Sequence, residues 1–225
     1  MLSLYHAPTT RSFRIQWLLD ELGTEYQLKE MNFYNNERHE PEFRAISPMG
    51  SIPVIVDDGF ALIESSAIIN YILRKYGNGR FTYPDGSKEA ALVDQWMSWS
   101  ESLFAIHQRI YWDHCAPFPA GLANPVPHVG IDAKQAALSY LGMLEQALGD
   151  DDYMVGDDLT GADFMLCFPL YLASLEGWLV NHPKTRAYIE RIAGRPKFAP
   201  VIADTVEVVR QFEALKAHQA SAANN

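Results

Sequence analysis

Residues 51–69, with the sequence SIPVIVDDGFALIESSAII, contain the clearest structural pattern in this chain of 225 residues. The β-branched residues Val54–Val56 predict a buried strand. Asp57-Asp58-Gly59 is typical of a hairpin turn, so a second strand is expected at Phe60–Ile63. A helix is predicted to follow from Ser65 to Tyr76. The segment therefore predicts a β-hairpin that leads directly into a helix.

Pro53 is unusual because a proline that enters a strand removes a hydrogen-bond donor from the sheet. A cis Ile52–Pro53 bond at the start of the strand is one solution. It would leave the N–H and C=O of Ile52 available to an extended peptide that adds to the sheet. The alternative is an edge-strand proline with no ligand. The residues alone leave both interpretations open.

Glu64 and Ser65 stand where the predicted helix begins. Amides at a helix start, together with a serine hydroxyl, form a site that favours a carboxylate. The neighbouring carboxylate of Glu64 could hold an ammonium group, so the pair would suit the amino-acid end of a zwitterion. The alternative is an ordinary helix cap, because serine is a preferred capping residue.

Thr9-Thr10-Arg11-Ser12 gathers three hydroxyls and a guanidinium group at the start of an earlier predicted helix. Hydroxyl donors and the helix start would stabilise a sulfur anion placed there. A free thiol titrates near a pKa of about 8.5, and lowering this by about two units requires roughly 2.7 kcal/mol. One hydroxyl donor and a helix end supply stabilisation of that order. Helix capping is again the alternative interpretation.

The rest of the first 80 residues completes a βαβαββα order. Its further predicted elements are a strand at Leu2–Tyr5, a helix from Phe13 that ends at Gly23, a strand at Tyr26–Met31 and a short helix at Glu40–Ile46. Residues 77–87 contain three glycines and one proline, which is typical of a linker. We therefore expect one domain at 1–80 and a second at 81–225.

The second part shows helical patterns only. Helices are expected at 88–115, 132–148, 161–178, 184–194 and 198–216, with a long proline-rich loop at 116–130. Thr160 and Asp163 form a predicted capping box at the start of the third of these helices, with Leu159 and Phe164 at the staple positions. Asp163 is therefore expected to be structural rather than a catalytic acid.

Composition and charge exclude several classes of function. The chain has 18 basic and 28 acidic side chains, a net charge of −10, which argues against nucleic-acid binding. Its two cysteines suggest neither a disulfide framework nor a metal site. The chain contains no run of about 18 apolar residues and its first residues are unlike a signal peptide, so we expect a cytoplasmic protein without a membrane span. Residues 1–80 carry 8 basic and 10 acidic side chains, which makes this less acidic part the better place for an anion site.

Taken together, these motifs resemble the cytosolic glutathione S-transferases, in particular bacterial members with a Ser/Thr-type active-site loop. The resemblance covers nearly the whole chain. The resemblance rests on the order and spacing of four segments: 4–12, 47–53, 57–68 and 156–163. The last of these resembles the capping motif of the family's helical domain. The resemblance implies a thioredoxin-like first domain that binds glutathione and an all-α helical-bundle second domain.

The resemblance also implies roles for individual residues. Glu64 and Ser65 would hold the γ-glutamyl end of glutathione, and the backbone of Ile52, before Pro53, would pair with its cysteinyl part. Ser51 lies where relatives bind the glycine end. Among the catalytic candidates Thr9, Thr10, Arg11 and Ser12, Thr9 best matches the activating hydroxyl, with Arg11 as electrostatic support.

The expected activity is transfer of glutathione to hydrophobic electrophiles, as in detoxification, with glutathione as co-substrate, no metal and a homodimeric assembly. A glutathione-dependent peroxidase or disulfide reductase, and a non-catalytic binding module, are the alternatives. The electrophile pocket is expected between the domains. Phe104, His107 and Tyr111 share one helical face and are its candidates together with Tyr5.

Overall fold

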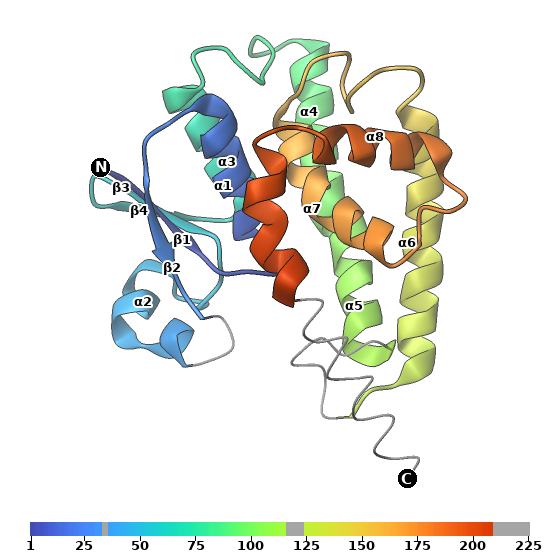
Figure 1. Cartoon of the computed structure of the whole chain (residues 1–225), viewed down its shortest axis with the longest axis horizontal. Helices are drawn as coiled ribbons and strands as arrows, with labels where there is room; N and C mark the ends of the chain where they lie inside the picture. Colours follow the sequence, from blue (N-terminus) through green and yellow to red (C-terminus); the bar gives the residue numbers. More distant parts are fainter. Residues whose placement is uncertain (33–35, 116–123, 209–225) are drawn as a thin grey trace.

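The computed structural model describes residues 1–32, 36–115 and 124–208, and shows a sheet-bearing part followed by a helical part (Figure 1). Four strands form one mixed sheet in the order β2-β1-β3-β4. Their bounds are β1 Leu2–His6, β2 Gln27–Glu30, β3 Val54–Asp57 and β4 Phe60–Ile63. β1 and β2 are parallel, whereas β1–β3 and β3–β4 are antiparallel. The predicted thioredoxin-like βαβαββα architecture is confirmed.

Three helices and one short turn of helix complete this part. They are α1 Ser12–Leu22, η1 Glu37–His39, α2 Pro41–Ile46 and α3 Ser65–Tyr76. Alternation along the strands separates two faces of the sheet. Leu4 and Ile55 belong to the large core that includes α1 and α3, whereas Val54 packs with Phe43 of α2. Each face of the sheet is therefore covered by helix.

The second part is helical throughout its described residues. Its elements are α4 Lys88–Trp99, the π-helical segment η2 Ser100–Ala105, α5 Ile106–Cys115, α6 Pro127–Ala147, α7 Gly161–Leu175 and α8 Pro183–Ala193, followed by helix at 198–208. The helix predicted at 88–115 is thus continuous but contains a π-helical segment. The predicted helix at 198–216 is present up to residue 208, and the rest of it lies outside the described residues.

The prediction of a loop at 116–130 was partly wrong, because α6 begins at Pro127. Proline is compatible with the first turn of a helix, where its missing N–H has no partner to lose. Gly130 then packs closely against α5: a Cβ atom built there would lie 2.5 Å from the sulfur of Cys115. The first part of the predicted loop, 116–123, lies outside the described residues.

The core runs without interruption from the sheet into the helical part. Trp17 of α1 is fully buried, and its ring lies 4.5 Å from that of Phe164 in α7 and 5.3 Å from that of Phe198. Glu21 of α1 also pairs with Arg195, with 2.7 Å between Oε1 and Nε. The first helix is therefore fixed against the helical part, where it contacts both α7 and the helix at 198–208, which Figure 1 shows in red next to α1.

The predicted capping box is present at the start of α7. The backbone N–H of Thr160 donates to Asp163 Oδ2 at 2.6 Å, and its hydroxyl donates to the same atom at 2.9 Å. The other carboxylate oxygen accepts from the Tyr188 hydroxyl at 2.6 Å and from the Met154 N–H at 3.0 Å. Asp163 is fully buried and is structural, as the sequence predicted.

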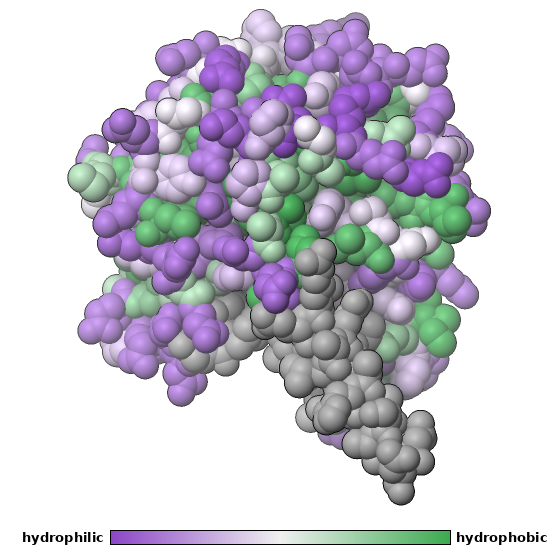
Figure 2. Space-filling model, in the orientation of Figure 1, coloured by the Kyte–Doolittle hydropathy of each residue, from purple (hydrophilic) through white to green (hydrophobic). Residues whose placement is uncertain are grey.

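The face of the molecule shown in Figure 2 is mainly hydrophilic, with smaller hydrophobic areas between the polar side chains. This distribution is ordinary for a folded chain, whose surface always retains apolar atoms. No helix among the described residues combines the length and the apolar character needed to cross a bilayer.

Candidate functional site

The register of the sheet brings the predicted site segments together. Tyr5 of β1 is opposite Val54 of β3, which in turn is opposite Ile63 of β4. The residues that follow β1, precede β3 and follow β4 therefore lie at the same end of the sheet. These are the three segments that contain Thr9–Ser12, Ser51–Pro53 and Glu64–Ser65.

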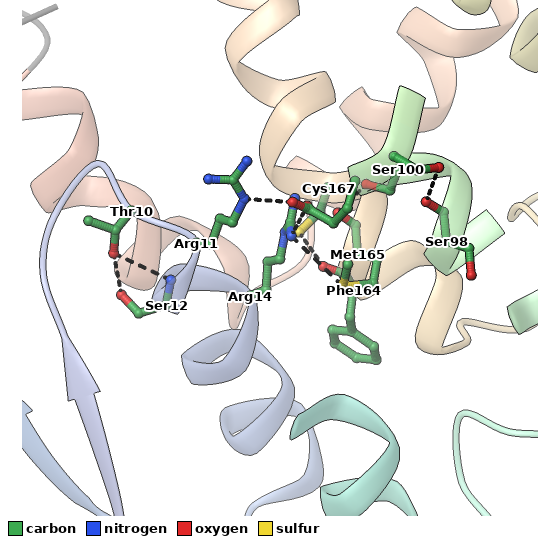
Figure 3. A network of polar contacts seen from close by, with 11 residues as sticks. Thr10, Arg11, Ser12, Arg14, Ser98, Ser100, Phe164, Met165 and Cys167 are labelled. Carbon is green, nitrogen blue, oxygen red and sulfur yellow. Dashed lines mark hydrogen bonds and ion pairs between the residues drawn. The ribbon is translucent and has the colours of Figure 1, made fainter. Parts of the chain in front are cut away.

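Ser12 and Thr10 hold the loop that follows β1. Ser12 is fully buried, and its hydroxyl oxygen accepts from the Ala7 N–H at 3.2 Å and lies 2.9 Å from Nδ1 of His6. The Thr10 hydroxyl donates to the Ala7 carbonyl at 2.7 Å and lies 2.7 Å from the Ser12 hydroxyl. Both hydroxyls are thus engaged in shaping the loop, as Figure 3 shows for the Thr10–Ser12 contact.

Thr9 differs from its two neighbours because it is only half-buried and lines a cavity. Its φ is 62°, in the left-handed region that a threonine rarely adopts. Its N–H donates to the Thr205 hydroxyl at 3.0 Å, and its own hydroxyl donates to the Pro8 carbonyl at 2.6 Å. Strained backbone of this kind is concentrated at functional sites. Thr9 and Thr10 both line the cavity, and Thr9 is the less buried of the two.

The Ile52–Pro53 peptide bond is cis, and β3 begins directly after it. Because β3 lies between β1 and β4, the edge-strand interpretation of Pro53 was wrong. Ser47 fixes the preceding turn: its hydroxyl donates to the Ser51 carbonyl and accepts from the Ser51 N–H, both at 2.9 Å. Within the described part of the chain, neither the N–H nor the C=O of Ile52 has a hydrogen-bond partner. An extended ligand could pair with both.

Glu64 and Ser65 begin α3 in the position that the sequence predicted. Glu64 is exposed and has a φ of 71°, so its backbone, like that of Thr9, lies in the left-handed region. No side chain caps the start of α3. The Ser65 hydroxyl has no partner among the described residues, although the residue is only 5% exposed. The plain helix-cap interpretation of these residues therefore lacks its hydrogen bond.

Two arginines of the α1 region reach toward the helical part (Figure 3). Arg11 Nε donates to Glu101 Oε2 at 2.8 Å, and Arg14 Nη1 donates to Glu101 Oε1 at 2.5 Å. Burial alone would raise the pKa of Glu101, but the guanidinium groups of Arg14 and Arg11 outweigh it and keep that pKa below its ordinary value. Glu101 thus remains ionised and joins the loop to the π-helical segment η2.

A cavity of about 110 Å³ lies where this loop meets the helical part. Its lining residues come from both halves of the chain: Thr9, Thr10, Arg11, Arg14, Ile52, Ala105, Gln108, Arg109, Trp112, Phe168 and Pro169. The Gln108 amide donates to the Pro169 carbonyl at 3.0 Å and so fixes α5 against α7. The sequence prediction of a pocket between the two halves therefore has a structural counterpart, although its lining differs.

The four residues predicted for the electrophile pocket are not among those that line this cavity. Phe104 is fully buried and stacks on Trp99, and the His107 ring lies 5.2 Å from that of Tyr140 in α6. Tyr111 packs against Trp178 at 5.1 Å. Phe104 thus packs within its own continuous helix, whereas His107 contacts α6 and Tyr111 contacts the turn after α7.

Tyr5, the fourth predicted residue, packs against Phe43 of α2, with 5.6 Å between the rings. It packs against the small core that contains Ala7, Ile52 and Val54, and so lies under the loop that follows β1. The cavity residues of η2 and α5 could have been found in the sequence, because 105, 108, 109 and 112 recur at helical spacing. Their mixed small, polar and aromatic character concealed them beside the more conspicuous aromatic face.

The chain's own thiols offer no second nucleophile at the site. Cys167 is fully buried in α7, and burial raises the pKa of its thiol far above the ordinary value. Cys115 lies at the far end of α5, with its sulfur directed to the Pro127 carbonyl at 3.2 Å. Among the described residues, no group of three histidine, cysteine or acidic side chains is placed to hold a metal ion.

Comparisons with known proteins agree on one family. Residues 1–74 match the model of the glutathione S-transferase N-terminal domain, and residues 131–196 match that of the C-terminal domain. Glutathione S-transferase 1 of Triticum aestivum is 31% identical over 202 residues, covering 85% of this chain and 88% of that protein. Glutathione S-transferase 3 of Schizosaccharomyces pombe is 28% identical over 209 residues, covering 87% and 84%.

Solved structures give the same result. A glutathione transferase homolog from Lodderomyces elongisporus, crystallised with two GSH per subunit, is similar with a TM-score of 0.81 and 25% identity. The match covers 90% of this chain and 97% of that one. Glutathione transferase F7 from Populus trichocarpa is similar with a TM-score of 0.79 and 26% identity, covering 91% and 99%.

Proposed function

The chain belongs to the glutathione S-transferase family, and on this premise we propose how it binds glutathione and activates its thiol. The reaction is the transfer of glutathione to an electrophile: the sulfur forms a new bond while the leaving group departs. The observation that supports the assignment of the site most strongly is the common location of Thr9, Ile52 and Ser65 at one end of the sheet.

Glutathione is proposed to lie along this end of the sheet in an extended form. Ile52 offers its N–H and C=O to the cysteinyl part, in the manner of a strand that adds to the sheet. Ser65 and the start of α3 hold the γ-glutamyl carboxylate, because amides at a helix start favour an anion. Glu64 holds the ammonium group, and Ser51, beside the cis Pro53, faces the glycine end.

Thr9 is proposed as the hydroxyl that donates to the glutathione sulfur. In this proposal the Thr9 hydroxyl turns from the Pro8 carbonyl, to which it donates at 2.6 Å, toward the sulfur. Thr10 and Ser12 support it by fixing the loop through their hydrogen bonds with Ala7. Arg11 adds positive charge, although its pairing with Glu101 offsets part of that charge. A hydrogen bond to a thiolate is charge-assisted and contributes about 1.5–3 kcal/mol, which corresponds to roughly one to two pKa units.

The remaining expectations are also proposals: a cytoplasmic homodimer that acts in detoxification, with a glutathione domain at 1–80 and a helical domain at 81–225. The position of the cavity between the halves supports a small electrophile with an apolar body, because Ile52, Trp112 and Phe168 form part of its wall. Glutathione-dependent reduction of peroxides or disulfides would use the same thiol, and binding without turnover is the third possibility.

Retention on immobilised glutathione, and turnover of 1-chloro-2,4-dinitrobenzene and cumene hydroperoxide, separate these possibilities. We expect retention and faster turnover of the chloroarene. In Ser65→Ala, KM for glutathione should rise about tenfold with little change in kcat, because the hydroxyl contacts a part of the substrate that does not react. Ser66→Ala, one residue along α3, should behave as the unmodified protein. Retention with neither activity would favour a binding module, and absence of retention would contradict the proposed site.

A further inference from the structure

The cavity beside Thr9 is lined by positively charged side chains, to which a purely apolar electrophile would not bind. Its ionisable lining residues, within the part of the chain that the structure describes, are three arginines, Arg11, Arg14 and Arg109. Two carboxylates lie behind them: Glu101 pairs with Arg11 and Arg14, and Asp113 pairs with Arg109. The cavity wall therefore retains a net positive charge in a protein whose total charge is −10.

Arg14 makes this pattern more specific because its side chain is completely buried. Its Nη1 atom donates to Glu101 and to the sulfur of Met165, the latter at 3.8 Å. Its Nε and Nη2 atoms are buried and have no hydrogen-bond partner among the residues that the structure describes. A buried charge that is incompletely paired is costly, and because Arg14 lines the cavity it adds positive charge to this wall.

Arg109 lies on the outer side of the same cavity. Its side chain is 53% exposed, and its Nε and Nη2 atoms pair with Asp113 at 2.9 and 2.7 Å. The guanidinium group has five N–H donors, so this pairing leaves others for a ligand. Trp112 and Phe168, also on the wall, supply aromatic surface for the apolar body of the same ligand.

We propose that the second substrate of this transferase is a small electrophile that carries a carboxylate, that Arg109 binds this carboxylate and that Arg14 adds positive charge behind it. This inference rests on the proposed glutathione site, because the cavity adjoins Thr9 and Ile52. Arg109 is then a specificity-determining residue. The guanidinium groups orient the acceptor so that its reactive carbon is presented to the glutathione sulfur at Thr9.

A matched pair of chloroarenes tests the proposal: 4-chloro-3-nitrobenzoate, which is anionic, and 4-chloro-3-nitrobenzamide, which is neutral. In both, the glutathione thiolate forms a C–S bond to the ring carbon that carries chlorine, the C–Cl bond breaks and chloride leaves. The thiol proton goes to solvent. Each kcat/KM is divided by the uncatalysed rate constant with glutathione, so that the intrinsic reactivity of the two rings cancels.

The unmodified enzyme should prefer the benzoate by about tenfold on this scale. Arg109→Gln should lower that preference about tenfold, which corresponds to about 1.4 kcal/mol. Arg109→Lys should recover part of it, because the positive charge remains. Arg186→Gln is the matched control: Arg186 is 52% exposed and pairs with Glu190 four residues later, as Arg109 does with Asp113. It should leave the preference unchanged.

Equal normalised rates for the two arenes in the unmodified enzyme would overturn the proposal. So would an Arg109→Gln variant that slows both arenes equally while raising KM for glutathione, since Arg109 would then bind the tripeptide itself. Absence of turnover with either arene, together with absence of retention on immobilised glutathione, would instead contradict the proposed function.

Discussion

At the scale of single residues, the role of each hydroxyl at this site depends on the hydrogen bonds that it already makes within the loop. Thr9, Thr10 and Ser12 all carry a hydroxyl within four positions, and the sequence alone could not rank them by environment. In the structure the hydroxyls of Thr10 and Ser12 are buried and bonded to Ala7, whereas Thr9 is half-buried and donates to the Pro8 carbonyl. Sequence identifies the chemistry of a loop, but the loop's fold determines how far each hydroxyl is exposed.

His6 gives a residue-scale prediction about pH. Burial lowers its pKa to about 4, an effect that the nearby carboxylate of Asp204 only partly opposes. The unfolded chain takes up this proton near a pKa of about 6.5. Folding is therefore favoured above that pH, and the free energy of unfolding declines as pH falls toward 4. Between pH 7 and pH 5, this single group should cost about 2 kcal/mol.

Urea unfolding of the unmodified chain and of His6→Asn at both pH values measures this term. The difference in the free energy of unfolding between the two proteins should shrink by about 2 kcal/mol on going from pH 7 to pH 5. The comparison depends only on the change with pH, so any loss of packing in the variant cancels. Parallel pH dependence in the two proteins would rule out a neutral, buried His6.

At the scale of elements, the strands and helices were predicted well where the pattern was local. The hairpin of β3 and β4 and the capping box of α7 depend on turn and cap residues that the sequence shows directly. The start of α6 was not predicted, because proline and glycine are typical of loops. In this helix Pro127 stands in the first turn and Gly130 permits close approach to α5.

The π-helical segment η2 was not predicted, because it is matched to an irregularity in α7. Pro169 within α7 has no N–H to donate to the Met165 carbonyl one turn earlier. The buried Ser100 hydroxyl, at the start of η2, donates to that carbonyl at 3.1 Å. Two irregular segments far apart in the sequence thus complete each other, and periodicity within either segment does not show this.

Asp163 gives the prediction that belongs to this scale. Asp163→Ala should lower the free energy of unfolding by about 3 kcal/mol, because buried donors of Thr160, Met154 and Tyr188 lose their acceptor. Denaturant unfolding measures it. Asp157→Ala, at an exposed position before the same helix, should change stability by less than about 0.5 kcal/mol. An Asp163→Ala protein as stable as the control would refute the structural role.

At the scale of the whole molecule, some features of the fold follow from sequence patterns, and others depend on packing between the two parts of the chain. The sequence predicted the sheet-bearing and helical parts, and it placed Thr9, Ile52 and Ser65 in segments that the sheet register unites. It did not predict the cavity lining, because that depends on which face of α5 meets the loop after β1. Packing of α1 against α7 settles this, through Trp17 and Phe164.

The proposed site holds glutathione across these united segments, with its sulfur at Thr9. The most direct measurement is the pKa of the glutathione thiol when bound to the protein, followed by the ultraviolet absorbance of the thiolate. A free thiol has a pKa of about 8.5, and hydrogen bonding to Thr9 should lower it by roughly one to two units. Thr9→Ser should preserve this shift, and Thr9→Ala should reverse about one unit of it. A bound thiol with the same pKa as the free one, or a Thr9→Ala protein that keeps the full shift while Ser12→Ala loses it, would contradict the account.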